Sequence, residues 1–369
     1  MRIAAGGRKE DCAVMNAKEL TRFLLPLREH EQQMRECFLR YPAAYRQMNH
    51  GWEDFRQLCC REYGGAISFP EKEVGFMGPE LSEQDCFADE HREINVILHD
   101  RFFPPYCQRV GFLKILYCLC GQAEFYTGQT AAVLSAGDFV MVPPGEEHAV
   151  CAAGENALTL NLIIKKSTFG SAFASLLAGQ NLISDFFWQM LYCKGGMDAL
   201  LFRCENDGRL SDLIVRLWEE NDESGCSNDV LIKGLVILFF GTVIKYHADN
   251  VEQLKTCREG GRRLSEMIRY MVANYQTVTL SAMAEHFHRS EGYISRYIHS
   301  ETGKTFRLLL REFRLEKAAE MLRSSACTVE EVVGAVGYTE PSRFYRNFKE
   351  RFGTTPAAYR QRSGLAGFY

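Results

Sequence analysis

Two short stretches near the carboxyl end combine small polar and basic side chains at helical spacing, an arrangement that can read base edges in DNA. In the first stretch the positions on the outer face are Ser290, Gly292, Ser295, Arg296 and His299. The positions between them are apolar and predict a buried stripe of Ile294, Tyr297 and Ile298. An arginine such as Arg296 can pair bidentately with a guanine edge, whereas a serine allows close approach or a phosphate contact. We therefore predict DNA-binding roles for all five outer positions.

The second stretch repeats this chemistry later in the chain. Its polar positions are Ser342, Tyr345, Arg346 and Lys349. Its inward positions recur at four-residue steps and are Phe344, Phe348 and Phe352. Pro341 suits the first turn of such a helix because its missing amide hydrogen has no partner there. We predict that this face also contacts DNA, with Arg346 reading a base.

Each stretch follows a shorter predicted helix, so the local plan is a helix-turn-helix in both places. Thr279 is a predicted N-cap for the helix Leu280–Phe287. Thr328 and Glu331 form a capping box, and Gly337 supplies the sharp turn of the second unit.

A long helix is predicted between the two units, over Thr305–Ser324, with apolar residues on two sides. A helix of this kind is sandwiched between two bodies, so it would fix the separation of the recognition helices. Two such helices on one face of a duplex sit about one turn, roughly 34 Å, apart.

These pieces resemble the DNA-binding domain of the AraC/XylS family of bacterial transcription regulators. The resemblance is carried by SEGYISRYIHSETGKTF, RLEKAAEML and VGYTEPSRFYRNFKERFGTTPAAYR. It implies that both recognition helices enter adjacent segments of the major groove, with base-facing sites at Gly292, Ser295, Arg296, Ser342, Tyr345 and Arg346. A larger side chain is common in the family at the position of Gly292, so we expect weaker base readout by the first helix. The alternative, an all-helical domain with solvated charges, fits one such unit better than two.

The charge distribution agrees with a nucleic-acid partner at one end of the chain. Residues 257–369 hold 18 Lys and Arg against 12 Asp and Glu, a net charge of +6. The remaining residues hold 25 and 35, a net charge of −10. An acidic body with a modestly basic end favours DNA binding at that end, through a few salt-sensitive phosphate contacts.

The segment Ile94–Lys165 differs from its surroundings because short β-rich runs alternate with Gly, Pro and polar turns. The runs are Ile94–His99, Phe112–Leu119, Ala123–Tyr126, Phe139–Val142 and Ala157–Ile164. Even spacing of this kind predicts a small β-barrel or double-sheet roll.

The run Gly137–His148 resembles the second motif of the cupin fold, the usual sensor domain of many AraC-type regulators. In the first cupin motif, however, Gln108, Val110 and Lys114 replace three of the usual metal ligands. One histidine beside a cationic lysine is a poor metal site, because an ion needs about three or four neutral or anionic ligands. We therefore expect no metal, no cofactor and no catalysis in this domain.

The same domain is a candidate effector site, because barrels of this size can enclose one small ligand. If Lys114 points inward, it would favour an anionic ligand such as a carboxylate or sugar acid. The alternatives are a solvated strand lysine and, for His148, a turn histidine bonded to backbone.

Residues 169–256 are predicted to be helical, with helices at Ser184–Cys193, Leu210–Glu220 and Asp229–His247. The last of these is apolar around most of its surface, which is typical of a buried or dimer-forming helix. The resemblance to AraC-type regulators implies a homodimer contact here. Asp249–Gly261 is a predicted hinge to the next domain.

The expected fold is therefore α+β and multidomain. The predicted parts are a helical N-terminal arm (1–63), a cupin-like effector-binding barrel (64–168), a helical linker and dimerisation region (169–256) and an all-α domain with two helix-turn-helix units (257–369). The N-terminus lacks a signal peptide, and the longest apolar run, Gly234–Ile244, is too short to span a bilayer. Fourteen scattered cysteines suit reduced thiols in a cytoplasm, with a thiol redox sensor as the alternative.

Three functions remain open at this point. The leading prediction is a cytoplasmic, sequence-specific DNA-binding transcription regulator, an activator or a repressor, that responds to a small effector and is not an enzyme. The second is a cupin-type metalloenzyme, an isomerase or oxygenase, with an accessory DNA-binding domain. The third is a constitutive DNA-binding protein whose barrel is only a dimer scaffold.

Overall fold

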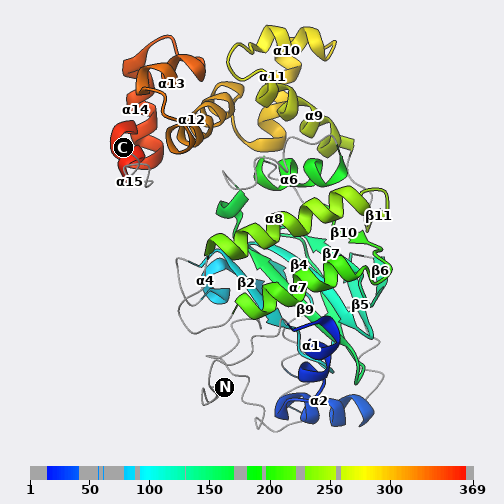
Figure 1. Ribbon diagram of the computed structural model, residues 1–369. Coiled ribbons are helices and arrows are strands. Elements are labelled where there is room, and N and C mark those ends of the chain that lie inside the picture. Colours follow the sequence, from blue (N-terminus) through cyan, green and yellow to red (C-terminus); the bar gives the residue numbers. More distant parts are fainter. Residues whose placement is uncertain are drawn as a thin grey trace. The chain divides into compact units, whose positions relative to one another are not determined.

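The chain folds into two compact units, each built from two separate segments. The computed structural model describes residues 15–40, 57, 61, 79–87, 92–128, 130–169, 181–192, 197–221, 229–254 and 259–362. The first unit comprises Met1–Lys165 and Asp198–Lys255, and the second comprises Lys166–Met197 and Thr256–Tyr369 (Figure 1).

The first unit contains two antiparallel sheets. The larger has the strand order β11-β10-β7-β4-β9-β2. Its strands are β2 (Ile94–Leu98), β4 (Leu113–Cys120), β7 (Phe139–Val142), β9 (Leu158–Ile164), β10 (Leu200–Phe202) and β11 (Val251–Gln253). The smaller has the order β6-β5-β8, with β5 (Gln122–Thr127), β6 (Thr130–Ser135) and β8 (Ala149–Cys151). A parallel pair of two-residue strands, β1 (Glu80–Leu81) and β3 (Arg109–Val110), lies beside them.

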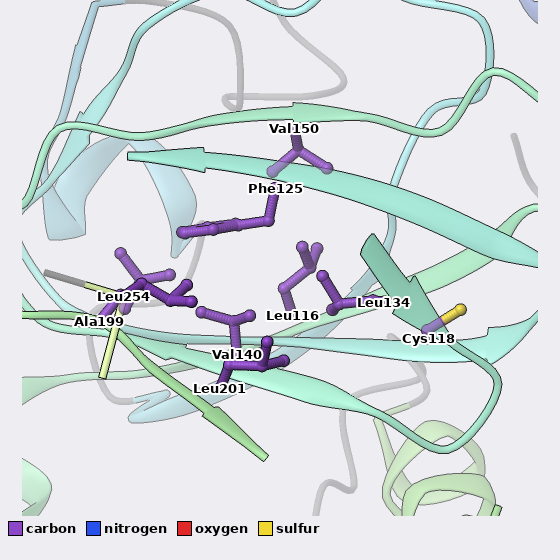
Figure 2. Packing of buried hydrophobic residues seen from close by; sticks show 10 residues of the cluster. Leu116, Cys118, Phe125, Leu134, Val140, Val150, Ala199, Leu201 and Leu254 are labelled. Carbon is purple, nitrogen blue, oxygen red and sulfur yellow. The ribbon is translucent and has the colours of Figure 1, made fainter. Parts of the chain in front are cut away.

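An apolar cluster lies between the two sheets, which together form a double-sheet roll. Side chains alternate along a strand, so Lys114, Leu116 and Cys118 of β4 point to the same side. Leu116 pairs in register with Val140, and both join a buried cluster whose other members come from both sheets. Figure 2 shows Phe125 and Val150 above this interior and Leu116, Val140 and Leu201 below it. The interior face of β4 is therefore the one that carries Lys114.

Helices cover the outer face of the large sheet. The helices α7 (Gly208–Glu220) and α8 (Asp229–Tyr246) pack against each other along that face (Figure 1). Phe139 of β7 stacks on Phe202 of β10 at 4.6 Å between ring centroids and tilts against Phe239 of α8 at 5.3 Å. Because both faces of β4 and β9 are buried, the sequences of these strands are nearly continuous apolar runs.

An N-terminal arm is attached to the roll by a buried ion pair. It consists of α1 (Ala17–Leu24), capped by Asn16, and α2 (Glu29–Arg40); a short helix, α4 (Glu83–Cys86), follows later. Glu31 of α2 and Arg101 are both fully buried, and Arg101 Nη2 donates to Glu31 Oε2 at 2.9 Å. Arg101 also donates to the carbonyls of Leu25, Pro26 and Glu155. Every nitrogen of this guanidinium therefore has an acceptor, which a buried charge requires.

The second unit is helical. It contains the short 3-10 helix η2 (Lys166–Phe169) and the helices α6 (Leu182–Tyr192), α9 (Glu259–Ala273), α10 (Leu280–His286), α11 (Glu291–Thr302), α12 (Phe306–Ser324), α13 (Val329–Ala335), α14 (Pro341–Phe352) and α15 (Pro356–Arg362). The helix α6 packs on α9, and Arg269 pairs with Asp185 at 3.2 Å.

The mixed helix and sheet composition is as predicted, and the five predicted β runs correspond to β2, β4, β5, β7 and β9. The prediction of one helical region over 169–256 was wrong. It is divided between the two units, because α6 packs on α9 whereas β10 and β11 complete the large sheet. The predicted hinge Asp249–Gly261 was also wrong in detail, since β11 and the start of α9 lie within it. Of the predicted arm and barrel, residues 1–14, 41–56, 58–60, 62–78, 88–91 and 129 lie outside the described residues.

Candidate nucleic-acid interface and the polar cluster of the roll

The first helix-turn-helix consists of α10 and α11, and side chains cap both helices. The hydroxyl of Thr279 accepts from the amide of Ala282, and the hydroxyl of Ser290 accepts from the amide of Tyr293 at 3.2 Å. His288 adopts a positive φ of 51° in the turn between the helices. Ile294 and Ile298 are fully buried, as the sequence pattern predicts. The opposite face of α11 is thereby left to solvent.

The DNA-contact positions predicted on α11 are accessible. Ser290, Gly292, Arg296 and His299 are exposed, and Ser295 is half-buried. A Cβ placed on Gly292 would lie 3.6 Å from Nη1 of Arg296, in ordinary van der Waals contact. Gly292 therefore leaves a free surface along which the Arg296 guanidinium lies. Tyr297 was predicted to be buried, but it is half-buried and its ring stacks on that of Tyr293 at 5.8 Å.

The second helix-turn-helix consists of α13 and α14. Thr328 and Glu331 make the predicted capping box, and Gly337 forms the turn with a φ of +81°. Phe344 and Phe348 are fully buried, and the exposed predicted positions on α14 are Ser342, Arg346 and Lys349.

Tyr345 differs from the other predicted contact residues of α14. Its ring is half-buried and packs beside the apolar cluster of α12, α13 and α14. Partial burial, followed by the nearby carboxylate of Glu330, raises the pKa of its phenol. Tyr345 therefore has a packing role whether or not it contacts DNA.

The helix α12 lies between the two helix-turn-helix units, as its two apolar sides predict. Leu315, Ala319 and Leu322 belong to the cluster shared with α13 and α14. Phe313 contacts the ring of Tyr192 of α6 edge-on at 4.9 Å, and that of Trp188 at 6.2 Å. The contribution of α6 to this domain was not predicted.

A second connection joins the two helix-turn-helix units through polar contacts. Arg314 of α12 donates through Nε to the carbonyl of Tyr275 at 2.8 Å and through Nη2 to that of Gln276 at 2.9 Å. The side chain of Gln276 donates to the carbonyl of Ala335 at 2.7 Å. A Cβ on Gly337 would lie only 2.4 Å from the carbonyl oxygen of Gln276, so only glycine fits. The segment 275–276 is therefore fixed to both α12 and the second turn.

Two exposed arginines of this domain were not predicted as functional, Arg307 of α12 and Arg343 of α14. Arg343 directly follows Ser342, and Arg307 begins a series that continues with Arg311 and Arg314 at steps of four and three residues. That spacing places the three arginines on one side of α12, a signal that was available in the sequence.

In the roll, Lys114 and His148 are brought together, and both are buried. Lys114 is 3% exposed and His148 is 1% exposed, and Nζ lies 3.1 Å from Nε2. The other ring nitrogen, Nδ1, lies 3.1 Å from the carbonyl oxygen of Glu146 and must carry the proton to donate to it. Nε2 is then free to accept from the Lys114 ammonium. The sequence-based alternative of a solvated lysine was wrong, whereas the backbone-bonded histidine was right.

Burial alters the charge state of this polar cluster. It lowers the pKa of Lys114 to about 8. It also lowers the pKa of His99 to about 4 and that of His148 well below its ordinary value, with the nearby Lys114 charge adding to both effects. At neutral pH the cluster therefore holds one ammonium beside two neutral imidazoles.

Further polar groups of β9 face the same interior. Thr159 is opposite Cys118 in the register and Asn161 is opposite Leu116. Among the described residues, neither the Thr159 hydroxyl oxygen nor Oδ1 of Asn161 has a hydrogen-bond partner, although both atoms are buried. Nδ2 of Asn161 lies 3.5 Å from Nδ1 of His99. Sequence reasoning missed His99, Thr159 and Asn161, because their alignment with Lys114 depends on the strand register.

The donor set does not fit a metal ion. Gln108 forms a β-bridge with His148, at the place that the cupin resemblance implies for a ligand pair. Nδ1 of His148 is committed to a carbonyl, and Nε2 faces an ammonium that would repel a cation. In the part of the chain that the structure describes, no three His, Cys, Asp or Glu side chains are grouped as metal ligands.

Comparisons with known proteins match both units. Residues 283–362 match a helix-turn-helix domain family, and residues 96–240 match the AraC-like ligand binding domain family. The chain is similar to the HTH-type transcriptional activator RhaR of Pectobacterium atrosepticum, at 24% identity over 62% of this chain and 76% of that protein. It is also similar to the raffinose operon transcriptional regulatory protein RafR of Pediococcus pentosaceus, at 24% identity over 37% of this chain and 50% of that protein.

Among solved structures, the C-terminal domain of AraT, a response regulator from Geobacillus stearothermophilus, is 31% identical over 31% of this chain and 94% of that chain, with a TM-score of 0.28. The chain spans half or less of the length of several curated relatives that it matches. None of the helices in the described ranges has the length and apolar character needed to cross a bilayer.

The fold and the two family matches define a protein that joins an AraC-like ligand-binding domain to an AraC-type helix-turn-helix domain. The curated relatives that the chain matches are transcription regulators of the AraC/XylS type.

Proposed function

We propose that the protein is a transcription regulator that binds a specific promoter site through α11 and α14. The observation that carries this proposal is the exposure of Arg296 and Arg346 on the two recognition helices α11 and α14. The shared helix α12 and the contacts of Arg314 fix these helices in one domain. Residues 257–369 would act as the DNA-binding domain, with Ser290, Gly292, Ser295, His299, Ser342, Tyr345 and Lys349 as further contacts.

The proposed effector is a small carboxylate that also carries a hydroxyl group, such as a sugar acid. Lys114 offers a buried ammonium, and no carboxylate pairs with it among the described residues. Oδ1 of Asn161 and the hydroxyl of Thr159 lack partners on the same interior face. Because an unpaired buried polar group costs about 1–3 kcal/mol, a ligand that satisfies these groups would gain affinity from each. His148 would orient Lys114.

We propose that the protein acts as a homodimer and that α8 forms the contact. Val230 is 79% exposed and Leu238 is 53% exposed, and their spacing places both on one side of α8. Gly234 and Gly241 lie on the exposed part of the same helix, and nothing approaches within 4 Å of a Cβ placed on either. A second copy of α8 could therefore approach closely.

The first experiment is footprinting of the full chain across its genome, followed by affinity measurements on the recovered sites. A regulator of this type protects discrete promoter sites and binds them at least about a thousandfold more tightly than random duplex. Equal affinity for all sequences would exclude the proposed specificity. Because the target is promoter DNA, we expect the protein in the cytoplasm.

The effector is tested separately, by thermal unfolding with sugar acids and with the matching neutral sugars. Stabilisation by the acids alone is expected. The absence of any stabilisation would leave a constitutive DNA-binding protein. We propose that the protein is not a metalloenzyme and has no enzymatic activity, because the Lys114–His148 pair is unfit for a metal. Metal analysis of the purified protein tests this point.

A further inference from the structure

The second unit contains an arginine-lined pocket beside the second recognition helix. Its volume is about 430 Å³, and its lining includes Arg307, Arg311 and Arg314 of α12 and Arg343 of α14. The one acidic lining residue is Glu340, which precedes α14. A pocket with four guanidinium groups and one carboxylate carries a strong positive charge.

The four arginines are not equally available to a ligand. Arg314 donates to the carbonyls of Tyr275 and Gln276, so its role is structural. Arg311 is 3.8 Å from a carboxylate oxygen of Glu350, a long and exposed pair. Within the described ranges, Arg307 and Arg343 form no ion pair and no side-chain hydrogen bond, and both are exposed.

The positive charges also act on one another. Burial lowers the pKa of Arg314, and the nearby charge of Arg343 lowers it further. An anion in the pocket would replace this repulsion by attraction. The N-terminus of α14 adds to the effect, because Glu340 makes no side-chain cap bond to its first amides.

We propose that this pocket binds a phosphate group of the DNA backbone, next to the base pairs that α14 contacts. A guanidinium group can donate two parallel hydrogen bonds to two oxygens of one phosphate. Arg307 and Arg343 are therefore the expected direct ligands. Arg343 adjoins Ser342, so a duplex that reaches the predicted reading face of α14 also reaches the pocket. This inference rests on the proposed DNA-binding function and adds a contact that fixes the position of the duplex without reading its sequence.

The test compares Arg307→Gln and Arg343→Gln with the control Arg351→Gln in the full chain. Arg351 also lies on α14, but it pairs with Glu316 at 2.8 Å and does not line the pocket. Binding to a random-sequence duplex and to a selected site is measured by fluorescence anisotropy over a series of salt concentrations. Each pocket variant should bind both duplexes several-fold more weakly, and the slope of log K against log salt should flatten by about 0.9. The control should retain the slope of the unmodified protein.

A second measurement separates the backbone from a free phosphorylated molecule. Inorganic phosphate and a nucleoside triphosphate are each added in thermal unfolding experiments without DNA. Stabilisation that Arg307→Gln abolishes, together with unchanged DNA affinity, would assign the pocket to a free ligand and overturn the proposal. A loss confined to the selected site would make Arg343 a base-reading residue and also overturn it.

Failure of the proposed DNA-binding function can be distinguished from failure of the pocket proposal. If the unmodified protein binds no duplex, the proposed function is wrong and the pocket proposal fails with it. If the unmodified protein binds and both pocket variants behave like Arg351→Gln, only the pocket proposal fails.

Discussion

Nζ of Lys114 lies 3.1 Å from Nε2 of His148, and both side chains are buried in the roll. The neutral imidazole can accept one hydrogen bond from the ammonium but cannot balance its charge. Lys114 is therefore a buried cation that is only partly satisfied, and such a group is commonly retained for function rather than stability.

Replacement of Lys114 by Met should stabilise the protein without ligand. The pKa of about 8, against an ordinary value of 10.5, corresponds to about 3 kcal/mol of unfavourable interaction with the charged form. The unfolded chain binds the proton more tightly, so the stability of the unmodified protein should rise as pH increases from about 8 to 10.5. Urea unfolding at pH 7 should show that Lys114→Met is more stable than the unmodified protein by up to about 3 kcal/mol. At pH 10 this difference in the free energy of unfolding should be smaller.

The control for this measurement is Lys18→Met, because Lys18 is exposed on α1. It should change stability by less than about 0.5 kcal/mol at both pH values. A destabilised Lys114→Met would mean that the lysine makes contacts that outweigh the burial of its charge. In the ligand titrations, Lys114→Met should lose the stabilisation by sugar acids, and affinity of the unmodified protein for them should fall above pH 8.

Arg296→Ala and Arg346→Ala should each weaken binding to the selected site by about 1–3 kcal/mol and relax base preference at one position. The reason is that each arginine can make a bidentate contact to a guanine edge. Selection from a randomised duplex pool measures the preference, with Arg216→Ala of α7 as a surface control. Equal losses on selected and random DNA would show that these arginines contact only phosphate.

If α8 forms the proposed dimer contact, Leu238→Glu should give a monomer. The substitution places a charge in the exposed apolar stripe of α8, where a self-associating interface would bury it. Sedimentation velocity measures the change, and Val133→Glu provides the control because Val133 is 46% exposed on β6, away from that helix. If both variants keep the mass of the unmodified protein, α8 does not form the dimer contact.

Glu31→Gln should destabilise the first unit by about 3–5 kcal/mol, because it leaves the fully buried Arg101 without its counter-charge. Despite burial, hydrogen bonds from Arg28 and Arg101 lower the pKa of Glu31 to about 2. The ion pair therefore contributes its full stability above the ordinary value of 4.5 and loses it as pH falls toward 2. Unfolding curves at pH 7, 4 and 3 test both statements. The control is Glu155→Gln, which removes the more exposed ion-pair partner of Arg35. It should lower the free energy of unfolding by less than about 1 kcal/mol.

Gly337→Ala should lower the free energy of unfolding by more than about 2 kcal/mol, because a side chain at positive φ is strained and its Cβ would meet the Gln276 carbonyl. Gly334→Ala is the matched control, because it lies in α13 with open space around its Cβ, and alanine is the better helix former. Differential scanning calorimetry of the second unit's transition compares them. A Gly337→Ala protein as stable as Gly334→Ala would show that segment 275–276 is free to move away.

Local signals explain what the sequence predicted well. Caps such as Thr279, Ser290 and Thr328 define helix starts through contacts within three residues, so each helix-turn-helix could be recognised from a short window. Continuous apolar runs such as Leu158–Ile164 identify strands buried on both faces.

Contacts between distant residues explain what the sequence did not predict. The strand β10 has only three residues, and it exists because β7 and β11 pair with it from either side. The convergence of Lys114, Asn161 and Thr159 depends on the register of β4 with β9. The pairing of Phe313 with Tyr192 joins residues that no local pattern connects, which is why α6 was assigned to the wrong region.

The placement of α6 in the second unit and of β10 in the first means that the polypeptide passes between the units three times, near residues 165, 197 and 255. No single proteolytic cut can release an intact DNA-binding fragment. A fragment that begins at residue 257 would lack α6, and the ring of Phe313 would be exposed to solvent. Excision of that half for biochemical work therefore requires α6 to be supplied as well, for example by fusing residues 166–197 ahead of residue 256.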